Sequence, residues 1–194
     1  MSDTPETPGS ATLFRRRSAF LAPIWLLALA GIIVIAVAFT YWNSATTTTV
    51  VVIRHADKGP NAIADAPLSP PGEQRAVRLA QMFGDGEKFG RVKKLYVTET
   101  RRAQQTVAEL AQRLGVKPEV VDSKASSSQL ARRVLRENRG GLALVVGHSN
   151  TVPEIVETMA DVENVPRMDD EEFDTMYIVT VPTIGRASVL RLKY

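Results

Sequence analysis

The stretch TVVVIRHADKGPN, Thr49–Asn61, joins an apolar run to a cluster of charged residues. Four β-branched residues, Val50–Ile53, lead directly into Arg54 and His55. An apolar run of this length, followed by a polar loop, is typical of a central parallel strand that is buried on both faces. Arg54 would be costly to bury at the end of such a strand without an anionic partner. The stretch therefore predicts a buried strand that ends at a site for an anion.

The rest of the chain repeats this alternation of short apolar runs and amphipathic stretches. The predicted strands cover residues 50–55, 93–99, 118–122 and 142–148, and helices are predicted over 70–83, 101–115, 126–141 and part of 149–160. Two final strands, over 175–181 and 187–194, are expected to form a hairpin at the sheet edge. Strands that alternate with helices predict an α/β fold with a largely parallel sheet.

Several helices carry start and stop signals. Ser69 can cap a helix whose first residue is Pro70, and Gly115 is placed to end the second helix. Helical spacing of apolar residues predicts the faces that pack on the sheet. For the first helix these residues are Ala76, Leu79, Ala80 and Phe83, and for the third they are Leu130, Val134 and Leu135.

The N-terminal region predicts a membrane anchor. Residues 1–19 form a polar tail, and residues 20–42, FLAPIWLLALAGIIVIAVAFTYW, follow without a charge. As a helix this segment is roughly 34 Å long, which is enough to cross a hydrocarbon core of about 30 Å. Residues 43–49, NSATTTT, are expected to form a short polar spacer before the domain at 50–194.

The charges around this segment predict its orientation. Residues 15–17 are three arginines, and none follows the segment closely, so we expect a single-pass protein with a cytoplasmic N-terminus and an extracytoplasmic domain. One alternative is a cleaved export signal, with residues 36–38, Ala-Val-Ala, as the cleavage site. The segment RRRSAFL also resembles a twin-arginine signal. The other alternative is a buried core helix.

Composition excludes several classes of function. The chain has no cysteine, so disulfides and thiolate metal sites are absent. A net charge of +3 does not indicate nucleic-acid binding, and no Gly-Lys-Ser/Thr of a P-loop occurs. Two histidines are too few for a typical zinc site. The acidic run DDEEFD, residues 169–174, is expected to be a solvated loop rather than a cation site.

Both histidines fall at the same topological place. His55 ends VVVIRH and His148 ends LALVVGH, so each follows a predicted central strand. Arg54 precedes His55, and Arg101 and Arg102 follow the second predicted strand at the same edge. Ligands bind at the carboxyl edge of open α/β sheets. Arginine matches phosphate oxygens and neutral imidazole is a nucleophile, so these residues predict phosphoryl chemistry.

The sequence resembles the histidine phosphatase superfamily, which includes the phosphoglycerate mutases. The matching stretches are VVIRHADK, LSPPGEQRA, TETRRAQQT and VVGHSNTVPEI, in the order of the family. The resemblance covers Val50 to about Ile155 and implies a three-layer α/β/α fold with a mostly parallel central sheet. In length the chain is similar to the short phosphatases, including those that act on protein phosphohistidine.

The resemblance implies a phosphatase that hydrolyses a phosphomonoester or phosphohistidine. It makes His55 the nucleophile that becomes phosphohistidine, and it makes Arg54, Arg102 and His148 the residues that bind the phosphoryl group. Arg102 is chosen over Arg101 because its spacing to Gln105-Thr106 matches the family. The family needs no metal and no cofactor. The expected substrate is a phosphorylated small molecule or a phosphoprotein.

The general acid has no counterpart in the matching motifs. Asp57 follows the nucleophile closely and is the first candidate, with Glu99 and Glu154 as the other nearby acids. The serine hydrolase reading of GHSNT is disfavoured, since no histidine follows Ser149. The alternative function is a membrane-anchored, non-catalytic phosphate-binding domain of the same fold.

Overall fold

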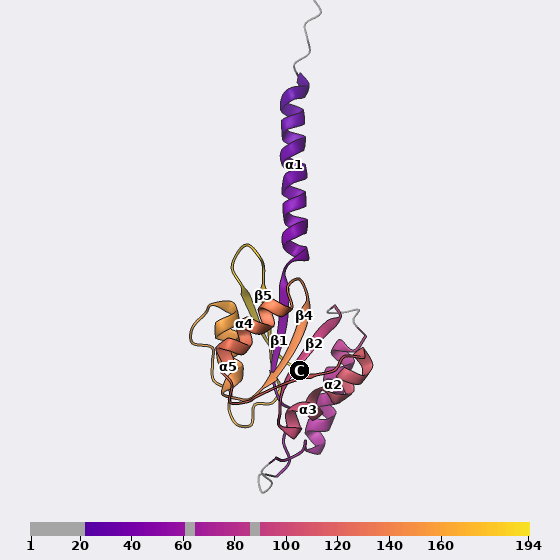
Figure 1. Cartoon of the computed structure of the whole chain (residues 1–194), viewed down its shortest axis with the longest axis vertical. Coiled ribbons are helices and arrows are strands. Elements are labelled where there is room, and N and C mark those ends of the chain that lie inside the picture. The colour runs from indigo at the N-terminus through magenta and orange to yellow at the C-terminus, as the bar shows by residue number, and fades with distance from the viewer. Residues whose placement is uncertain (1–21, 61–64, 86–89) are drawn as a thin grey trace, which may run out of the picture. The chain divides into compact units, whose positions relative to one another are not determined.

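The protein is described here by a computed structural model that covers residues 22–60, 65–85 and 90–194. The chain forms two compact units, Met1–Phe39 and Thr40–Tyr194. Figure 1 traces the elements in chain order. They are α1 (Ala22–Ala45), β1 (Thr48–Arg54), α2 (Pro70–Phe83), β2 (Val92–Thr98), α3 (Arg101–Leu114), β3 (Glu119–Val121), α4 (Ser127–Glu137), β4 (Leu142–Gly147), α5 (Thr151–Ala160), β5 (Thr175–Val181) and β6 (Ser188–Lys193).

Helix α1 is the apolar segment that the sequence predicts. Within Ile24–Ala45, an 18-residue window has a mean hydropathy of 2.5, and none of that window is buried. At 1.5 Å per residue Ile24–Ala45 is roughly 33 Å long, so it is a candidate membrane span by length and composition. The expected polar tail, residues 1–19, lies outside the described residues.

The expected polar spacer at 43–49 is divided between two elements. Helix α1 runs on to Ala45 and β1 begins at Thr48. The hydroxyl group of Thr46 donates to the carbonyl oxygen of Trp42, and that of Thr47 donates to the carbonyl of Asn43. These bonds satisfy carbonyls at the end of the helix, which explains why the polar residues extend it.

The second unit is built on a six-stranded sheet in the order β3-β2-β4-β1-β5-β6. Strands β3, β2, β4 and β1 are parallel, and β5 and β6 form the antiparallel hairpin at one edge. Ile53 pairs with Val146 and Arg54 with Gly147, so the carboxyl ends of β1 and β4 coincide. The α/β fold with a mostly parallel sheet and an edge hairpin is confirmed.

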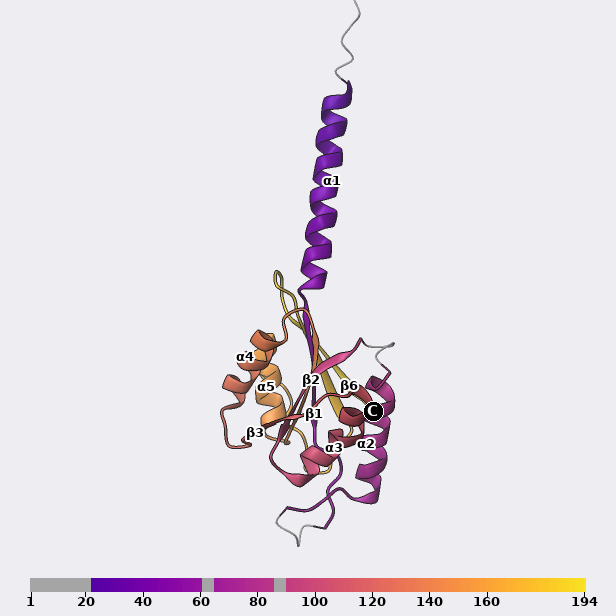
Figure 2. The ribbon, with the colours of Figure 1, turned by 45° about the vertical axis from the view of Figure 1, so that its right-hand side comes forward.

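Strand β1 supplies side chains to two cores on opposite faces of the sheet. Val50 and Val52 pack with the core that contains Ile155 of α5, and Val51 and Ile53 pack with the core that contains Leu110 of α3. Figure 2 shows α4 and α5 on one face of the sheet and α2 and α3 on the other. Because both faces of β1 are covered, its sequence is continuously apolar rather than alternating.

The local helix signals are confirmed, with one difference. Ser69 Oγ accepts from the amide of Gly72 at the start of α2, and Gly115 ends α3 in the left-handed region at φ 65°. In α4 the buried residues are Ser127, Ala131 and Val134. Leu130 and Leu135 are only partly buried because they lie on either side of this stripe.

Candidate active site

A pocket of about 380 Å³ opens at the carboxyl edge of the parallel strands. Four of the five residues singled out in the sequence line it, and Asp57 does not. The lining residues are Arg54, His55, Lys58, Thr100, Arg102, Ser123, His148, Ser149, Asn150 and Asp170. The pocket is therefore rich in cationic and hydroxyl groups and contains two imidazoles.

His55 is held at the junction of β1 and β4. Its amide donates to the carbonyl oxygen of Gly147, and the next amide, of Ala56, donates to the hydroxyl of Thr106. The Nδ1 atom lies 2.8 Å from the carbonyl oxygen of Ala56. A carbonyl only accepts, so Nδ1 carries the proton and Nε2 is left with a free lone pair.

Burial keeps His55 in its neutral form. The side chain is 3% exposed, and this burial lowers its pKa to about 3, with a further lowering by the charge of Arg102. A neutral imidazole with a free Nε2 is the nucleophilic form. The lowered pKa therefore favours an unprotonated His55 at physiological pH.

His148 faces His55 from the end of β4. The two ring centroids are 5.3 Å apart and the rings are inclined at 65°. Its Nε2 lies 3.0 Å from the hydroxyl oxygen of Thr98, and its amide donates to the hydroxyl of Thr151. Burial, followed by the charge of Arg102, lowers the pKa of His148.

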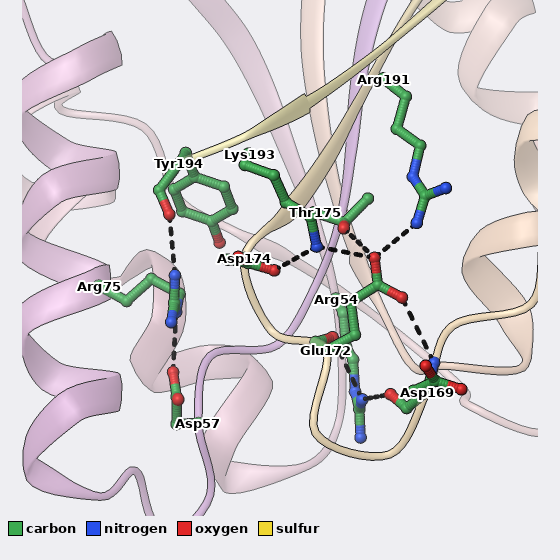
Figure 3. A network of polar contacts seen from close by, with 10 residues as sticks. All are labelled: Arg54, Asp57, Arg75, Asp169, Glu172, Asp174, Thr175, Arg191, Lys193 and Tyr194. Atoms are coloured by element: carbon green, nitrogen blue, oxygen red, sulfur yellow. Dashed lines mark hydrogen bonds and ion pairs between the residues drawn. The ribbon is translucent and has the colours of Figure 1, made fainter.

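Arg54 is buried at the end of β1 and is fixed by a distant loop. Its Nη1 donates to the carbonyl oxygens of Asp169 at 2.7 Å and Glu172 at 3.3 Å (Figure 3). Its guanidinium carbon lies 4.1 Å from the centre of the Phe173 ring, which is a cation–π contact. Burial lowers the pKa of Arg54, although guanidinium stays charged in proteins.

Arg102 reaches the pocket from the first turn of α3. Among the described residues, Arg54 and Arg102 each have a buried Nε–H group with no acceptor. Unsatisfied buried donors cost free energy and are uncommon in folded proteins. Two of them on two cations at one pocket indicate a site for an anion. Arg101 is exposed, and its amide donates to the carboxylate of Asp65.

Comparisons with known proteins agree with this geometry. A family model described as the histidine phosphatase superfamily (branch 1) matches residues 50–124, which include Arg54, His55 and Arg102. The match supports a relation of this part of the chain to the histidine phosphatase superfamily. At the level of the family, this similarity supports phosphatase activity. No curated protein sequence matches the chain.

Solved structures of several phosphatases share the fold. The protein histidine phosphatase SixA complexed with tungstate is 22% identical, with a TM-score of 0.58 over 75% of this chain and 96% of that chain. The putative phosphohistidine phosphatase SixA from Agrobacterium tumefaciens is 18% identical, with a TM-score of 0.56 over 77% and 98%. A mycobacterial glucosyl-3-phosphoglycerate phosphatase is 14% identical, with a TM-score of 0.55 over 74% and 97%.

Two residues of the stretch TETRRAQQT hold the segments that follow His55 in place. The Thr106 hydroxyl accepts from the amide of Ala56 and donates to the carbonyl of Arg102. The Gln105 side-chain oxygen accepts from the amide of Leu68. The stretch therefore ties α3 to the segment after His55 as well as supplying Arg102. The spacing of the stretch singled out Gln105 and Thr106 in the sequence. Their partners in the distant loops, Leu68 and Ala56, lie 37 and 50 residues away and could not be predicted from it.

Asp57 does not take the place expected for a proton donor. Its carboxylate is 2.8 Å from Nε of Arg75, and Nη1 of the same arginine donates to the main-chain oxygen of Tyr194 (Figure 3). Although burial opposes it, the hydrogen bond from Arg75 lowers the pKa of Asp57. The Asp57 carbonyl accepts from the amide and the hydroxyl of Ser69, the cap of α2, and lies so close to Gly72 that a Cβ there would collide with it. Asp57 is therefore paired with Arg75 and does not line the pocket.

The two other acids considered in the sequence are also outside the pocket lining. Glu99 accepts from the amide and the hydroxyl of Ser123, which lowers its pKa, and it is exposed. Glu154 lines two neighbouring pockets instead. Among the described residues, the one carboxyl group that lines the site is that of Asp170.

The acidic run at 169–174 is part of the site wall, and its expected role as a solvated loop alone is wrong. Phe173 packs on Arg54 and lies 5.8 Å, between centroids, from the ring of His55. Glu172 anchors the loop by accepting from the hydroxyl of Thr175 and from Arg191 and Lys193 on β6. The Thr175 hydroxyl, followed by Lys193 and Arg191, lowers the pKa of Glu172 to about 2.

Proposed function

We propose that the domain hydrolyses a phosphomonoester or a phosphohistidine through a phosphohistidine intermediate on His55. The observation that carries this proposal is the state of His55, which is buried and neutral with Nδ1 occupied by a carbonyl and Nε2 free. Similarity to the superfamily supports the same chemistry.

In the first step, the phosphoryl group binds between the guanidinium groups of Arg54 and Arg102 and His148. Nε2 of His55 attacks phosphorus, the new P–N bond forms and the bond to the leaving group breaks. The phosphoryl charge that spreads over the equatorial oxygens is stabilised by the two fixed cations. In the second step water attacks phosphorus and loses a proton to the group that protonated the leaving oxygen. The P–N bond breaks, inorganic phosphate leaves and His55 regains its neutral form.

The leaving oxygen needs a proton when its conjugate acid is weak. We propose that Asp170 supplies it, because its carboxyl group is the one that lines the pocket in the described part of the chain. The geometry of a catalytic acid tightens in the substrate complex, so a candidate need not yet be bonded in the free enzyme. Asp57 is not proposed, since Arg75 occupies its carboxylate.

The position of the pocket supports a water-soluble substrate. β1 runs from Thr48, close to the end of α1, to Arg54 at the pocket. Six steps of about 3.3 Å place these two residues roughly 20 Å apart. Structural neighbours are named as phosphatases of protein phosphohistidine and of glucosyl-3-phosphoglycerate, and both substrate classes fit a small polar pocket.

We further propose that α1 anchors the domain in a membrane as a single pass, with residues 1–19 in the cytoplasm and the catalytic domain from residue 50 outside it. The charge-free helix and the arginines at 15–17 support this arrangement. Export with cleavage of the N-terminal segment is the alternative. A reporter fused after Tyr194 should be active outside the cytoplasm, and a cytoplasmic signal would contradict the orientation.

Turnover of a generic phosphoester separates this function from a non-catalytic phosphate-binding domain. We expect the detergent-solubilised full chain to hydrolyse para-nitrophenyl phosphate, and His55→Ala to reduce the rate by roughly 10³-fold or more. A binding domain would show no turnover in either form while still binding inorganic phosphate. Turnover that survives His55→Ala would exclude His55 as the nucleophile.

A further inference from the structure

A second groove, of about 480 Å³, lies at the opposite end of the sheet from the active site. It is bounded by the last turn of α4, the start of β1 and the turn between β5 and β6. The lining residues are Thr46, Thr48, Arg132, Leu135, Arg136, Arg139, Val181, Pro182 and Thr183. No acidic residue is among them.

The three arginines of this groove, Arg132, Arg136 and Arg139, are here called the arginine cluster. All three are exposed, and none of their guanidinium groups makes a hydrogen bond or an ion pair with another described residue. Arg133, on the same helix, differs because it pairs with Glu119 and Glu137. Arg133 is therefore neutralised, whereas Arg132 and Arg136 of α4, and Arg139 just after the helix, have no counter-charge among the described residues.

Several contacts hold the groove against the end of α1. The hydroxyl of Thr183 donates to the carbonyl of Thr46, and the amide of Ile184 donates to the side-chain oxygen of Asn43. Gly140, at φ 64°, approaches the carbonyl of Ala45 so closely that a Cβ would collide with it. Asn43, Ala45 and Thr46, which make these contacts, follow directly on the apolar part of α1.

This attachment limits how far the groove can lie from a bilayer. Thr46 is four residues beyond Trp42, so even a fully extended chain separates the two by no more than about 14 Å. The headgroup layer adds roughly 5 to 8 Å to each side of the hydrocarbon core. Thr46, at the edge of the groove, therefore stays near the headgroups of a membrane that α1 spans.

We propose that the arginine cluster binds the phosphate groups of anionic phospholipids in the membrane that α1 spans, which rests on the proposed membrane span. Guanidinium groups match phosphate oxygens bidentately, and basic side chains are attracted to an anionic surface. Ile184, 51% exposed at the tip of the β5–β6 turn, provides an apolar side chain that enters the interface beside them. The partner is thus a lipid surface rather than a soluble anion.

The consequence is that the domain is oriented by its lipid contacts, with the active site held away from the bilayer. The active site lies at the other end of β1, roughly 20 Å from Thr48. Loss of the lipid contacts should leave the chemistry at His55 unchanged. The phosphatase proposal and the lipid proposal can therefore fail independently.

The test uses the full chain in nanodiscs and a fluorescent label at the turn. Since the sequence has no cysteine, Ile184→Cys gives a single labelling site, and Gln74→Cys on exposed α2 gives a reference site. The discs contain either phosphatidylcholine alone or phosphatidylcholine with phosphatidylglycerol, each with a nitroxide-labelled headgroup as quencher. We expect stronger quenching at position 184 with phosphatidylglycerol, reversed by high salt, and no change at position 74.

The variants separate the cluster from general charge effects. The quenching at position 184 reports the fraction of molecules whose β5–β6 turn contacts the lipid. Arg132→Gln/Arg136→Gln should lower the ratio of molecules with this contact to molecules without it roughly fivefold for each arginine removed. Arg78→Gln/Lys117→Gln removes two exposed cations elsewhere that make no side-chain hydrogen bond or ion pair with a described residue, and this variant should keep the quenching. All of these variants should keep the rate on para-nitrophenyl phosphate.

Equal quenching in the two lipid mixtures would overturn the proposal. Equal loss in the cluster and control variants would overturn it too, as would a full chain that fails to insert into nanodiscs. Quenching that persists while turnover is absent in the parent chain would support the lipid site and contradict the phosphatase.

Discussion

The two ends of the central sheet both gather arginines, but in opposite physical states. At the carboxyl end, Arg54 is 3% exposed, tied to two carbonyls and stacked on Phe173. At the other end, Arg132 and Arg136 are exposed and have no partner among the described residues. A buried cation of fixed position can stabilise charge that develops during a reaction. An exposed cation can attract an anionic surface but is screened by water and salt.

Substituting one arginine from each end gives the largest expected contrast. We predict that Arg54→Ala lowers kcat/KM for para-nitrophenyl phosphate roughly 10²- to 10³-fold, the usual effect of removing a preorganised charge or donor. Arg136→Ala should leave kcat/KM unchanged. Arg101→Ala, an exposed neighbour of Arg102, is a second control. Steady-state kinetics of the three variants measures this difference. A loss of kcat/KM in Arg101→Ala or Arg136→Ala as large as that in Arg54→Ala would contradict the distinction between the two ends of the sheet.

A smaller effect is expected for the proposed acid. Asp170→Asn should slow hydrolysis of alkyl phosphates about tenfold or more, while aryl phosphates with good leaving groups should be affected much less. Asp57→Asn should lower stability by loosening Arg75 and change both substrates alike. The measurement is the ratio of kcat values for the two substrates in each variant. An unchanged ratio in Asp170→Asn would remove Asp170 from the mechanism.

The smallest effect concerns stability and pH. The folded pKa of His55 is about 3, below its ordinary 6.5, so the folded state binds fewer protons than the unfolded state. Its contribution to the unfolding free energy is fully present above about pH 6.5 and is lost as the pH falls toward 3. Between about pH 7 and pH 5 this amounts to roughly 2 kcal/mol.

His55→Gln removes this contribution, and the lowered pKa of His148 leaves a second one in place. Urea unfolding of the full chain in detergent at the two pH values measures the difference between the parent and the variant. The parent should lose more stability on acidification than His55→Gln does. Equal losses would mean that His55 is not buried in its neutral form.

Much of the fold could be read from local sequence because local rules determine it. The run Val50–Ile53 is apolar on both faces because two cores cover β1. Ser69 and Gly115 act through bonds to residues in the same helix. The residues at the carboxyl edge were also predictable, because the ends of parallel strands such as β1 and β4 meet there.

The features that the sequence did not predict depend on contacts between distant parts of the chain. The loop that holds Arg54 is separated from it by 115 residues, and its acidic composition suggested only solvation. Asp57 looked available until the fold placed Arg75 beside it. Likewise, the arginine cluster lies next to the end of α1 only because β1 and β4 start side by side.

The most direct test of the central claim is the chemical identity of the phosphoenzyme. A rapid acid-free quench of the full chain with phosphoester, followed by peptide mass spectrometry and phosphorus NMR, locates the phosphoryl group. Because Nδ1 of His55 is bonded to the carbonyl of Ala56, we predict a phosphoryl group on Nε2 of His55 that is labile in acid and stable in base. A phosphoryl group on Nδ1, on His148 or on a serine would contradict it.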